Sequence, residues 1–461
     1  MKIVVIYPEV LDMARYRDKR KEFPPFGSLY IAASLENAGH EVKIYKLHPD
    51  NVVFDLTEFE AVAFSISASA TFNMFMECRF KSKLNPDALL MAGGVHANLF
   101  PEQTLVDLKV DVVGIGECEQ TILEILKEKD SKDFSGLLGV CYLENDVPKK
   151  IPQKRLSKNI DNFPLPARHL LEVDDFIMDD RMSNTNIKMT HVMPGRGCPF
   201  PCRYCASAQT TVQYRSGNDI RLELEHLVLK YGIKGFAVVG NDFILNKENV
   251  KDICKNISEL QLSWATLSRV DRVDEQILKA MKEAGCYELE FGVEAGSEKI
   301  LAAMDKKITK KQILAGLRMS HDAGINNKVF LIHGYPGENY ETTMETIELL
   351  EQIGDCVERV SLFRFVPLPG TYVSNFAHIF NVRGTYGSKE WDGDWGKFHI
   401  HHNHHHWWGT AEDFNELTKS YQVLYDYVES RWPSKYKLDD LSEDQWELQS
   451  KKFIRQPVLD I

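Results

Sequence analysis

The chain has 461 residues, of which 44% are hydrophobic and 26% charged, and its formal net charge is −12. This length predicts two or three domains, because one hydrophobic core stops growing at about 250–300 residues. The acidic balance gives no support to nucleic-acid binding, and no apolar run approaches the ~20 residues that span a bilayer. Nine cysteines, three of them clustered, are typical of a reduced, cytoplasmic protein with one metal site and not of a disulfide framework.

The first 145 residues alternate short β-branched runs with helical stretches. Strands are expected at residues 2–7, 41–45, 61–65, 88–92 and 111–114, with a helix over 26–38 that Gly39 closes. This alternation predicts an α/β fold whose first domain is a doubly wound, Rossmann-like parallel sheet. Such sheets bind ligands at the carboxyl ends of their strands, where the loops of this sequence are small and polar.

Residues 146–185 carry four prolines among charged residues and are expected to form a linker. A second strand–helix series then occupies residues 186–385, with strands expected at 187–193, 235–239, 263–267, 287–292, 328–332 and 359–365. Six such units predict a partial (β/α)6 barrel with reactive groups at its carboxyl-end face. Residues 386–461 are expected to form a His- and Trp-rich loop and then a mostly helical region from Thr410 onward.

A cysteine-rich segment follows the first strand of the second series. Residues 195–205 read Gly-Arg-Gly-Cys-Pro-Phe-Pro-Cys-Arg-Tyr-Cys, so Cys198, Cys202 and Cys205 have the spacing C-x3-C-x2-C. Three thiolates can bind three irons of a [4Fe–4S] cluster and leave the fourth iron without a protein ligand. A zinc site would need a fourth ligand, and the nearest candidate, His191, lies inside the preceding strand.

This segment resembles the cluster motif of the radical S-adenosylmethionine (SAM) superfamily, and segments after the later strands extend the resemblance. It implies that the open iron binds SAM, and that electron transfer then releases a 5′-deoxyadenosyl radical. The residues that the resemblance assigns to SAM are Tyr204, Gly240, Asn241, Asp242, Arg269, Glu294, Ser297, Gly334 and Pro336. Glu294 is expected near the ribose. The family's commoner Gly-Gly-Glu segment is absent, and Asp242 alone would also suit a helix start.

With this barrel downstream, the first domain resembles the cobalamin-binding domain of the cobalamin-dependent radical SAM class. The residues assigned to cobalamin are Ser65, Ser67, Ser69, Gly93, Gly94, His96, Gly114, Gly116 and Glu117. The sequence lacks the D-x-H-x-x-G motif that supplies a cobalt-binding histidine elsewhere, as is common in this class. Small residues would instead make room for the dimethylbenzimidazole tail. The alternative is a sheet domain that has lost the cofactor and only packs on the barrel.

The resemblance favours a methyltransferase that acts on an unactivated carbon, or on phosphorus, of a small molecule by way of methylcobalamin. A cobalamin-dependent cyclase, ring-rearranging or oxidative enzyme without methyl transfer is the alternative within the class. A tRNA methylthiotransferase is less compatible, because Cys78, Cys118 and Cys141 lack the pattern of a second cluster site. A cobalamin-binding sensor or scaffold without catalysis is the alternative outside enzymes. An electron donor such as flavodoxin or ferredoxin is the expected partner.

The His-rich tract of residues 399–408 is unusual. Several histidines close together can bind a metal, and they can equally line a substrate opening. His401, His404, His406 and Trp407 are the candidates for substrate contact, whereas a polar loop anchored by its tryptophans is the structural alternative. The other six cysteines are expected to be buried apolar residues, and only Cys118, at a strand end, is a candidate for catalysis.

Overall fold

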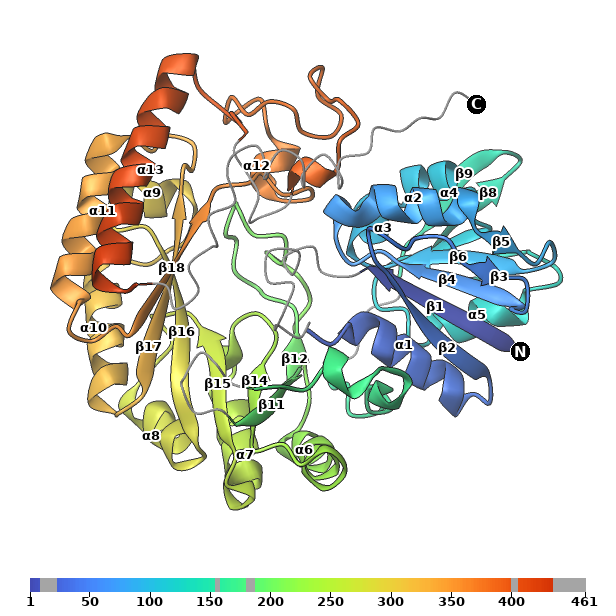
Figure 1. Ribbon diagram of the computed structural model, residues 1–461, viewed down its shortest axis with the longest axis horizontal. Coiled ribbons are helices and arrows are strands. Elements are labelled where there is room, and N and C mark those ends of the chain that lie inside the picture. Colours follow the sequence, from blue (N-terminus) through green and yellow to red (C-terminus); the bar gives the residue numbers. More distant parts are fainter. Residues whose placement is uncertain (9–22, 154–157, 180–186, 399–404, 434–461) are drawn as a thin grey trace.

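The computed structural model describes residues 1–8, 23–153, 158–179, 187–398 and 405–433. Two seven-stranded sheets organise these residues, one in each half of the molecule (Figure 1). No helix within the described ranges is long and apolar enough to cross a membrane.

The first sheet has the order β2-β1-β4-β6-β7-β8-β9, and its first five strands are parallel. Their bounds are β1 Lys2–Pro8, β2 Glu41–Leu47, β4 Ala61–Ser65, β6 Leu89–Gly93 and β7 Val112–Gly114. A separate short pair is formed by β3 Asp55–Leu56 and β5 Lys83–Leu84. These observations confirm the five strands expected from the β-branched runs.

Helices cover both faces of this sheet. In β1, Ile3 and Val5 pack in one buried cluster with α1 (Phe26–Asn37) and α5 (Thr121–Lys127). Val4 and Ile6 face the opposite cluster, which holds α2 (Phe72–Lys81) and α4 (Pro101–Leu108). Because alternate side chains of one strand are buried on both sides, the sheet is doubly wound as expected. The short helix α3 (Val95–Leu99) follows β6.

The first sheet continues past the expected boundary at residue 145, which is therefore placed too early. Two antiparallel strands, β8 (Val140–Glu144) and β9 (Val147–Ile151), form a hairpin at the edge of the sheet. Asn145 and Asp146 both have positive φ, as a two-residue hairpin turn requires. Pro148 favours a linker in the sequence, but it lies on the edge strand β9, where proline is tolerated.

The second sheet has the order β10-β11-β14-β15-β16-β17-β18 and is parallel from β11 onward. Its strands are β10 Met178–Asp179, β11 Lys188–Val192, β14 Gly235–Val238, β15 Ser263–Ser268, β16 Cys286–Glu294, β17 Asn326–His333 and β18 Arg359–Arg364. All six expected strands are confirmed. The expected linker ends too late, because β10 pairs with β11 inside its range.

Helices cover the outer face of this curved sheet, whose open side is turned toward the first domain (Figure 1). They are α6 Gly217–Tyr231, α7 Lys247–Ile257, α8 Glu275–Glu283, α9 Glu298–Ala303, α10 Lys310–Asp322 and α11 Tyr340–Ile353. The arrangement is the expected partial barrel. Its carboxyl-end loops, together with the open side, form the surface that the first domain approaches.

The C-terminal region contains α12 (Tyr372–Asn375) and the long helix α13 (Ala411–Arg431), which lies along α11 (Figure 1). Thr410 and Asp413 form the capping box of α13, which confirms the expected helix start. The segment between these helices sends three aromatic side chains, Trp395, Phe398 and Trp407, into a buried cluster of the first domain. Trp395 lies with its ring centroid 4.7 Å from that of His96.

Candidate active site

The three clustered cysteines lie on one loop at the carboxyl edge of the barrel. The loop leaves a short hairpin of β12 (Gly195–Arg196) and β13 (Gln213–Tyr214). At its start, Gly197 has a φ of +80°, and a Cβ there would lie 2.0 Å from the Thr211 carbonyl oxygen, so only glycine fits. Near the other end, the Thr210 N–H donates to the Cys198 carbonyl at 2.8 Å. The loop is therefore closed on itself around the thiols.

The chemistry of this donor set fits a cubane. All three residues are free cysteines, and Cys202 is buried whereas Cys198 and Cys205 are partly exposed. Within the described ranges, no three His, Cys, Asp or Glu side chains converge on a single metal ion; a cubane takes each thiolate on a different iron. Burial raises the pKa of Cys198 and of Cys205. Without iron these two thiols are therefore protonated near neutral pH. Bound iron would stabilise their thiolate form.

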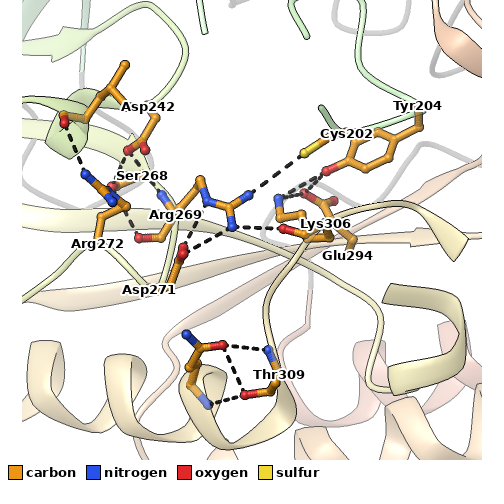
Figure 2. Close-up of polar contacts among 12 residues, drawn as sticks. Cys202, Tyr204, Asp242, Ser268, Arg269, Asp271, Arg272, Glu294, Lys306 and Thr309 are labelled. Carbon is orange, nitrogen blue, oxygen red and sulfur yellow. Dashed lines mark hydrogen bonds and ion pairs between the residues drawn. The ribbon is translucent and has the colours of Figure 1, made fainter. Parts of the chain in front are cut away.

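A buried cluster of Tyr204, Glu294 and Lys306 lies beside this loop (Figure 2). The Tyr204 hydroxyl donates to Glu294 Oε1 at 2.8 Å, and Lys306 Nζ donates to the same oxygen at 2.7 Å. Glu294 has a φ of +68°, which turns the chain at the end of β16. A side chain at Gly292 would meet Glu294 Oε1 at 2.5 Å, so glycine is needed there. Burial and the adjacent carboxylate hold the pKa of Tyr204 well above its usual value.

Arg269 joins the cysteine loop to this cluster (Figure 2). Its guanidinium lies 4.1 Å from the centre of the Phe200 ring, and Nη1 is 3.9 Å from Cys202 Sγ. Nη2 donates to the Lys306 carbonyl at 2.9 Å, and Asp271 accepts from both Nε and Nη2. A fixed positive charge therefore stands next to a thiol that would carry part of a cluster's negative charge.

A small, partly open pocket lies between the β12–β13 hairpin and the loop after β14, with Gly240, Asn241 and Asp242 in its lining. Asp242 Oδ1 accepts from the Ser268 hydroxyl at 2.7 Å. Asp242 Oδ2 is buried and has no hydrogen-bond partner among the described residues, and burial raises the pKa of this carboxyl. Because an unpaired buried acceptor is costly, the site suits a ligand that brings an N–H donor, such as the amino group of SAM.

The other residues expected at the SAM site are Ser297, Gly334 and Pro336, which are buried or partly exposed. Ser297 lies at the start of α9 and is fully buried, and its hydroxyl has no described partner. Gly334 has a φ of +92° after β17, and its carbonyl accepts from Trp408 Nε1 at 2.7 Å. Pro336 is partly exposed two residues later. The sequence interpretation missed Lys306, which lies in no recognisable motif, and it assigned no role to Trp408 within the His-rich tract.

In the first domain, small residues end three neighbouring strands. Ser65 of β4 is in register with Gly93 of β6, and the nearest neighbour to a Cβ at Gly93 would be the Gly114 carbonyl oxygen, at 3.9 Å. Gly94 has a φ of +96°, and a Cβ there would lie 2.7 Å from the Ile66 carbonyl oxygen. Ser67 is exposed at this edge. The edge therefore carries no bulky side chain, which fits a large planar cofactor with a tail.

His96 and Ser69 are buried next to this edge and contact one another. His96 is fully buried, with Nδ1 2.9 Å from Ser69 Oγ and Nε2 3.2 Å from Gln103 Oε1. Both ring nitrogens are therefore engaged by the protein, and burial lowers the pKa of His96 to about 4. His96 therefore positions Ser69, and its contact with cobalamin stays a prediction.

The loop after β7 is tied to its surroundings. The Gly116 N–H donates to Asn98 Oδ1 at 2.6 Å, and Glu117 forms an ion pair with Arg196 of the cysteine loop. Cys118 donates to the Gly116 carbonyl, and burial raises its thiol pKa to about 12. A thiol with that pKa is a poor nucleophile near neutral pH, which argues against the catalytic role considered for Cys118.

Two of the four candidate substrate residues, His401 and His404, lie outside the described residues. The ring of His406 stacks on Phe414 at 4.8 Å, and Nε2 lies 3.2 Å from Arg383 Nη2. Trp407 is buried and stacks on Phe398 at 5.5 Å. Trp407 therefore anchors its segment in the aromatic cluster, which corresponds to the structural alternative for that residue.

The structure thus joins a partial barrel with a three-cysteine loop to a doubly wound domain with a glycine-lined edge. The sequence pattern of the radical SAM superfamily matches residues 192–350, and that of the B12 binding domain matches residues 19–126. The chain therefore carries a radical SAM domain and a B12-binding domain.

Several relatives extend over most of the chain. An uncharacterized methyltransferase of Pyrococcus horikoshii is 29% identical over 396 residues, which are 83% of this chain and 84% of the relative. Cytidylyl-2-hydroxyethylphosphonate methyltransferase of Streptomyces wedmorensis is 25% identical, covering 75% and 76%. The anaerobic magnesium-protoporphyrin IX monomethyl ester cyclase of Cereibacter sphaeroides is 24% identical, covering 71% of this chain and 56% of the cyclase.

Among solved structures, the radical SAM methyltransferase TsrM from Kitasatospora setae, with cobalamin and a [4Fe–4S] cluster bound, has a TM-score of 0.63. The two proteins are 15% identical, and the alignment covers 84% of this chain and 79% of TsrM. At that identity the likeness concerns the fold, which both proteins share across the two domains.

Proposed function

We propose that this protein is a cobalamin-dependent radical SAM methyltransferase that acts on an unactivated carbon or phosphorus atom of a small molecule. One observation carries the proposal. Strand β12, which leads into the cysteine loop, contacts the loop after β7, which adjoins the glycine-lined edge, through the ion pair of Arg196 and Glu117. Two relatives that cover at least three quarters of the chain are named methyltransferases, which supports methyl transfer.

In this proposal, Cys198, Cys202 and Cys205 hold the cluster, and Asp242 accepts from the amino group of SAM. Glu294, held by Tyr204 and Lys306, accepts from the ribose hydroxyls. When bound, the cluster and SAM supply a 5′-deoxyadenosyl radical, and cobalamin supplies the methyl group. The chain's own contribution is to position these groups and to exclude water from the radical.

The small residues Ser65, Ser67, Gly93, Gly94 and Gly114 would accommodate cobalamin at the strand ends, while Ser69 and Gly116 shape the adjoining loops. Since a cluster with an open iron needs an electron for each SAM cleavage, we propose flavodoxin or ferredoxin as the donor. Free thiols and an open-corner cluster suit a reducing compartment such as the cytoplasm.

The decisive experiment needs no known substrate. The protein is reconstituted anaerobically with iron, sulfide and hydroxocobalamin, reduced, and incubated with SAM carrying a deuterated methyl group. We expect broad absorbance near 400 nm from the cluster, deuterated methylcobalamin, and S-adenosylhomocysteine alongside 5′-deoxyadenosine. Cluster formation without any cobalamin binding would contradict the proposal, and a lack of the cluster would favour a binding protein without radical chemistry.

The second candidate is a cobalamin-dependent cyclase or oxidative enzyme, and the similarity to the cyclase of Cereibacter sphaeroides favours it. Such an enzyme would cleave SAM once and transfer no methyl group. If the reconstituted protein binds cobalamin and forms 5′-deoxyadenosine, but never S-adenosylhomocysteine, this second candidate replaces methyl transfer.

A further inference from the structure

Arg196 lies two residues before the first cluster cysteine and contacts the first domain. Its guanidinium forms ion pairs with both Glu117 and Glu119, which follow β7. Only 12% of the Arg196 side chain and 4% of the Glu119 side chain are exposed. Two carboxylates from one domain therefore converge on a single side chain of the other, with Glu119 buried and Glu117 34% exposed.

Aromatic rings hold the guanidinium in place. It lies 4.9 Å from the ring centre of Tyr30 on α1 and 5.9 Å from that of Phe163. Arginine suits this site because its planar fork can donate to two carboxylates while it stacks on a ring, whereas lysine offers a single charged point. The contact thus fixes the orientation of the cysteine loop as well as its distance from the first domain.

The carboxylate side of the contact is also fixed. Gln153 Oε1 accepts from the Glu117 N–H at 3.1 Å, and Asn98 Oδ1 accepts from the neighbouring Gly116 N–H. These bonds tie the loop after β7 to the hairpin end of the first sheet and to α3. Because these hydrogen bonds hold the loop after β7 in place, Glu117 cannot follow a displacement of Arg196. Such a displacement would therefore break the ion pair.

We propose that Arg196 is a positioning residue that sets the separation and relative orientation of the two cofactors, by clamping the cysteine loop to the cobalamin-side loop through Glu117 and Glu119. The inference rests on the proposed function, because it needs both cofactors bound. Loss of the clamp leaves each cofactor in its own domain but changes how the two are placed relative to one another.

The test uses full-length reconstituted protein and four variants. Arg196→Gln removes the clamp, Arg196→Lys keeps the charge without the fork, and Glu119→Gln weakens the other side. The control is Arg318→Gln, which breaks an ion pair with Asp355 in the barrel, where both side chains are about half exposed. Cluster iron, bound cobalamin and thermal stability are measured first, and then the magnetic interaction between cob(II)alamin and the reduced cluster is measured by EPR.

We expect Arg196→Gln to bind both cofactors and to show a changed spin–spin interaction, with several-fold more 5′-deoxyadenosine formed per S-adenosylhomocysteine. Arg196→Lys and Glu119→Gln should shift both quantities in the same direction by less, and the control should match wild type. A merely structural role would lower both products together and leave the EPR interaction unchanged.

The inference is overturned if wild type shows the magnetic interaction and all three clamp variants retain it, with an unchanged product ratio. If Arg196→Gln does not fold, the same comparison is made with Arg196→Lys and Glu119→Gln. If wild type binds the cluster but no cobalamin, the proposed function itself fails, so the two failures are distinguishable.

Discussion

The two cofactor edges of this molecule are built in opposite ways. At the barrel edge, charged side chains hold one another in place, as Arg269 does for the cysteine loop and Lys306 for Glu294. At the edge of the first domain, Ser65, Gly93 and Gly114 leave the strand ends bare. A small charged ligand is held by charged and hydrogen-bonding side chains. A large cofactor needs space, which small residues at the strand ends provide.

This difference predicts that removing a thiol or a charge weakens cluster and SAM binding at the barrel edge. Adding a methyl group is expected to weaken cobalamin binding at the edge of the first domain. The largest effect is expected for Cys202→Ala, because a cubane that loses one of three thiolates also loses its open-iron geometry. Absorbance near 400 nm and SAM cleavage should both fall to background. Cys118→Ala is the matched control and should keep wild-type iron content, whereas wild-type SAM cleavage by Cys202→Ala would contradict the cluster assignment.

The second prediction concerns the buried carboxylate. Glu294→Gln keeps the size of the side chain but leaves the Lys306 ammonium buried without its counter-charge, which typically costs about 3–5 kcal/mol. We expect at least a ~100-fold loss in kcat/KM for SAM cleavage, together with a lower midpoint of thermal unfolding. Glu298→Gln, four residues further on at an exposed position of α9, should behave like wild type. Equal behaviour of the two variants would show that Glu294 has no special role.

The third prediction concerns His96, which is buried next to the strand ends of the first domain, and the pH dependence of stability. Burial lowers the pKa of His96 to about 4, below the ~6.5 of an unfolded histidine. The unfolded state therefore takes up a proton first, and His96 should contribute a loss of up to about 3 kcal/mol of stability as the pH falls from 6.5 to 4. Urea unfolding across this range should show a shallower loss for His96→Phe than for wild type. His378→Gln, at an exposed position, should leave the slope unchanged.

The smallest effect is expected where one methyl group is added. The space around a Cβ at Gly93 is free to 3.9 Å, so Gly93→Ala should fold with wild-type stability. The same methyl group would crowd a cobalamin tail, and overpacking of this kind costs about 1–3 kcal/mol, which corresponds to roughly tenfold weaker binding. Cobalamin titration followed by absorbance measures this, with Gly136→Ala, also in open space, as the control. Unchanged affinity would move the cofactor away from Gly93.

Sequence reasoning succeeded where the physical signal is local. The six barrel strands are short, largely apolar segments that alternate with helical segments, and the structure places each within two residues of its expected bounds. The β8–β9 hairpin was missed because Pro148 and its charged neighbours are as typical of a linker as of an exposed edge strand. Lys306 was missed for a different reason. Its hydrogen-bond partner Tyr204 lies 102 residues away, and no local pattern encodes a contact that only the folded barrel brings together.

The aromatic segment after the barrel has a consequence for how the chain is made. Trp395 packs against Phe72, His96 and Phe100, and it follows the last strand of the first sheet, which ends at Ile151, by about 240 residues, so the first domain cannot complete its hydrophobic interior until those residues are made. Until Trp395 is made, the side chains of Phe72, His96 and Phe100 lack this contact. The first domain is therefore synthesised first, but its aromatic cluster is completed only after the barrel has been synthesised.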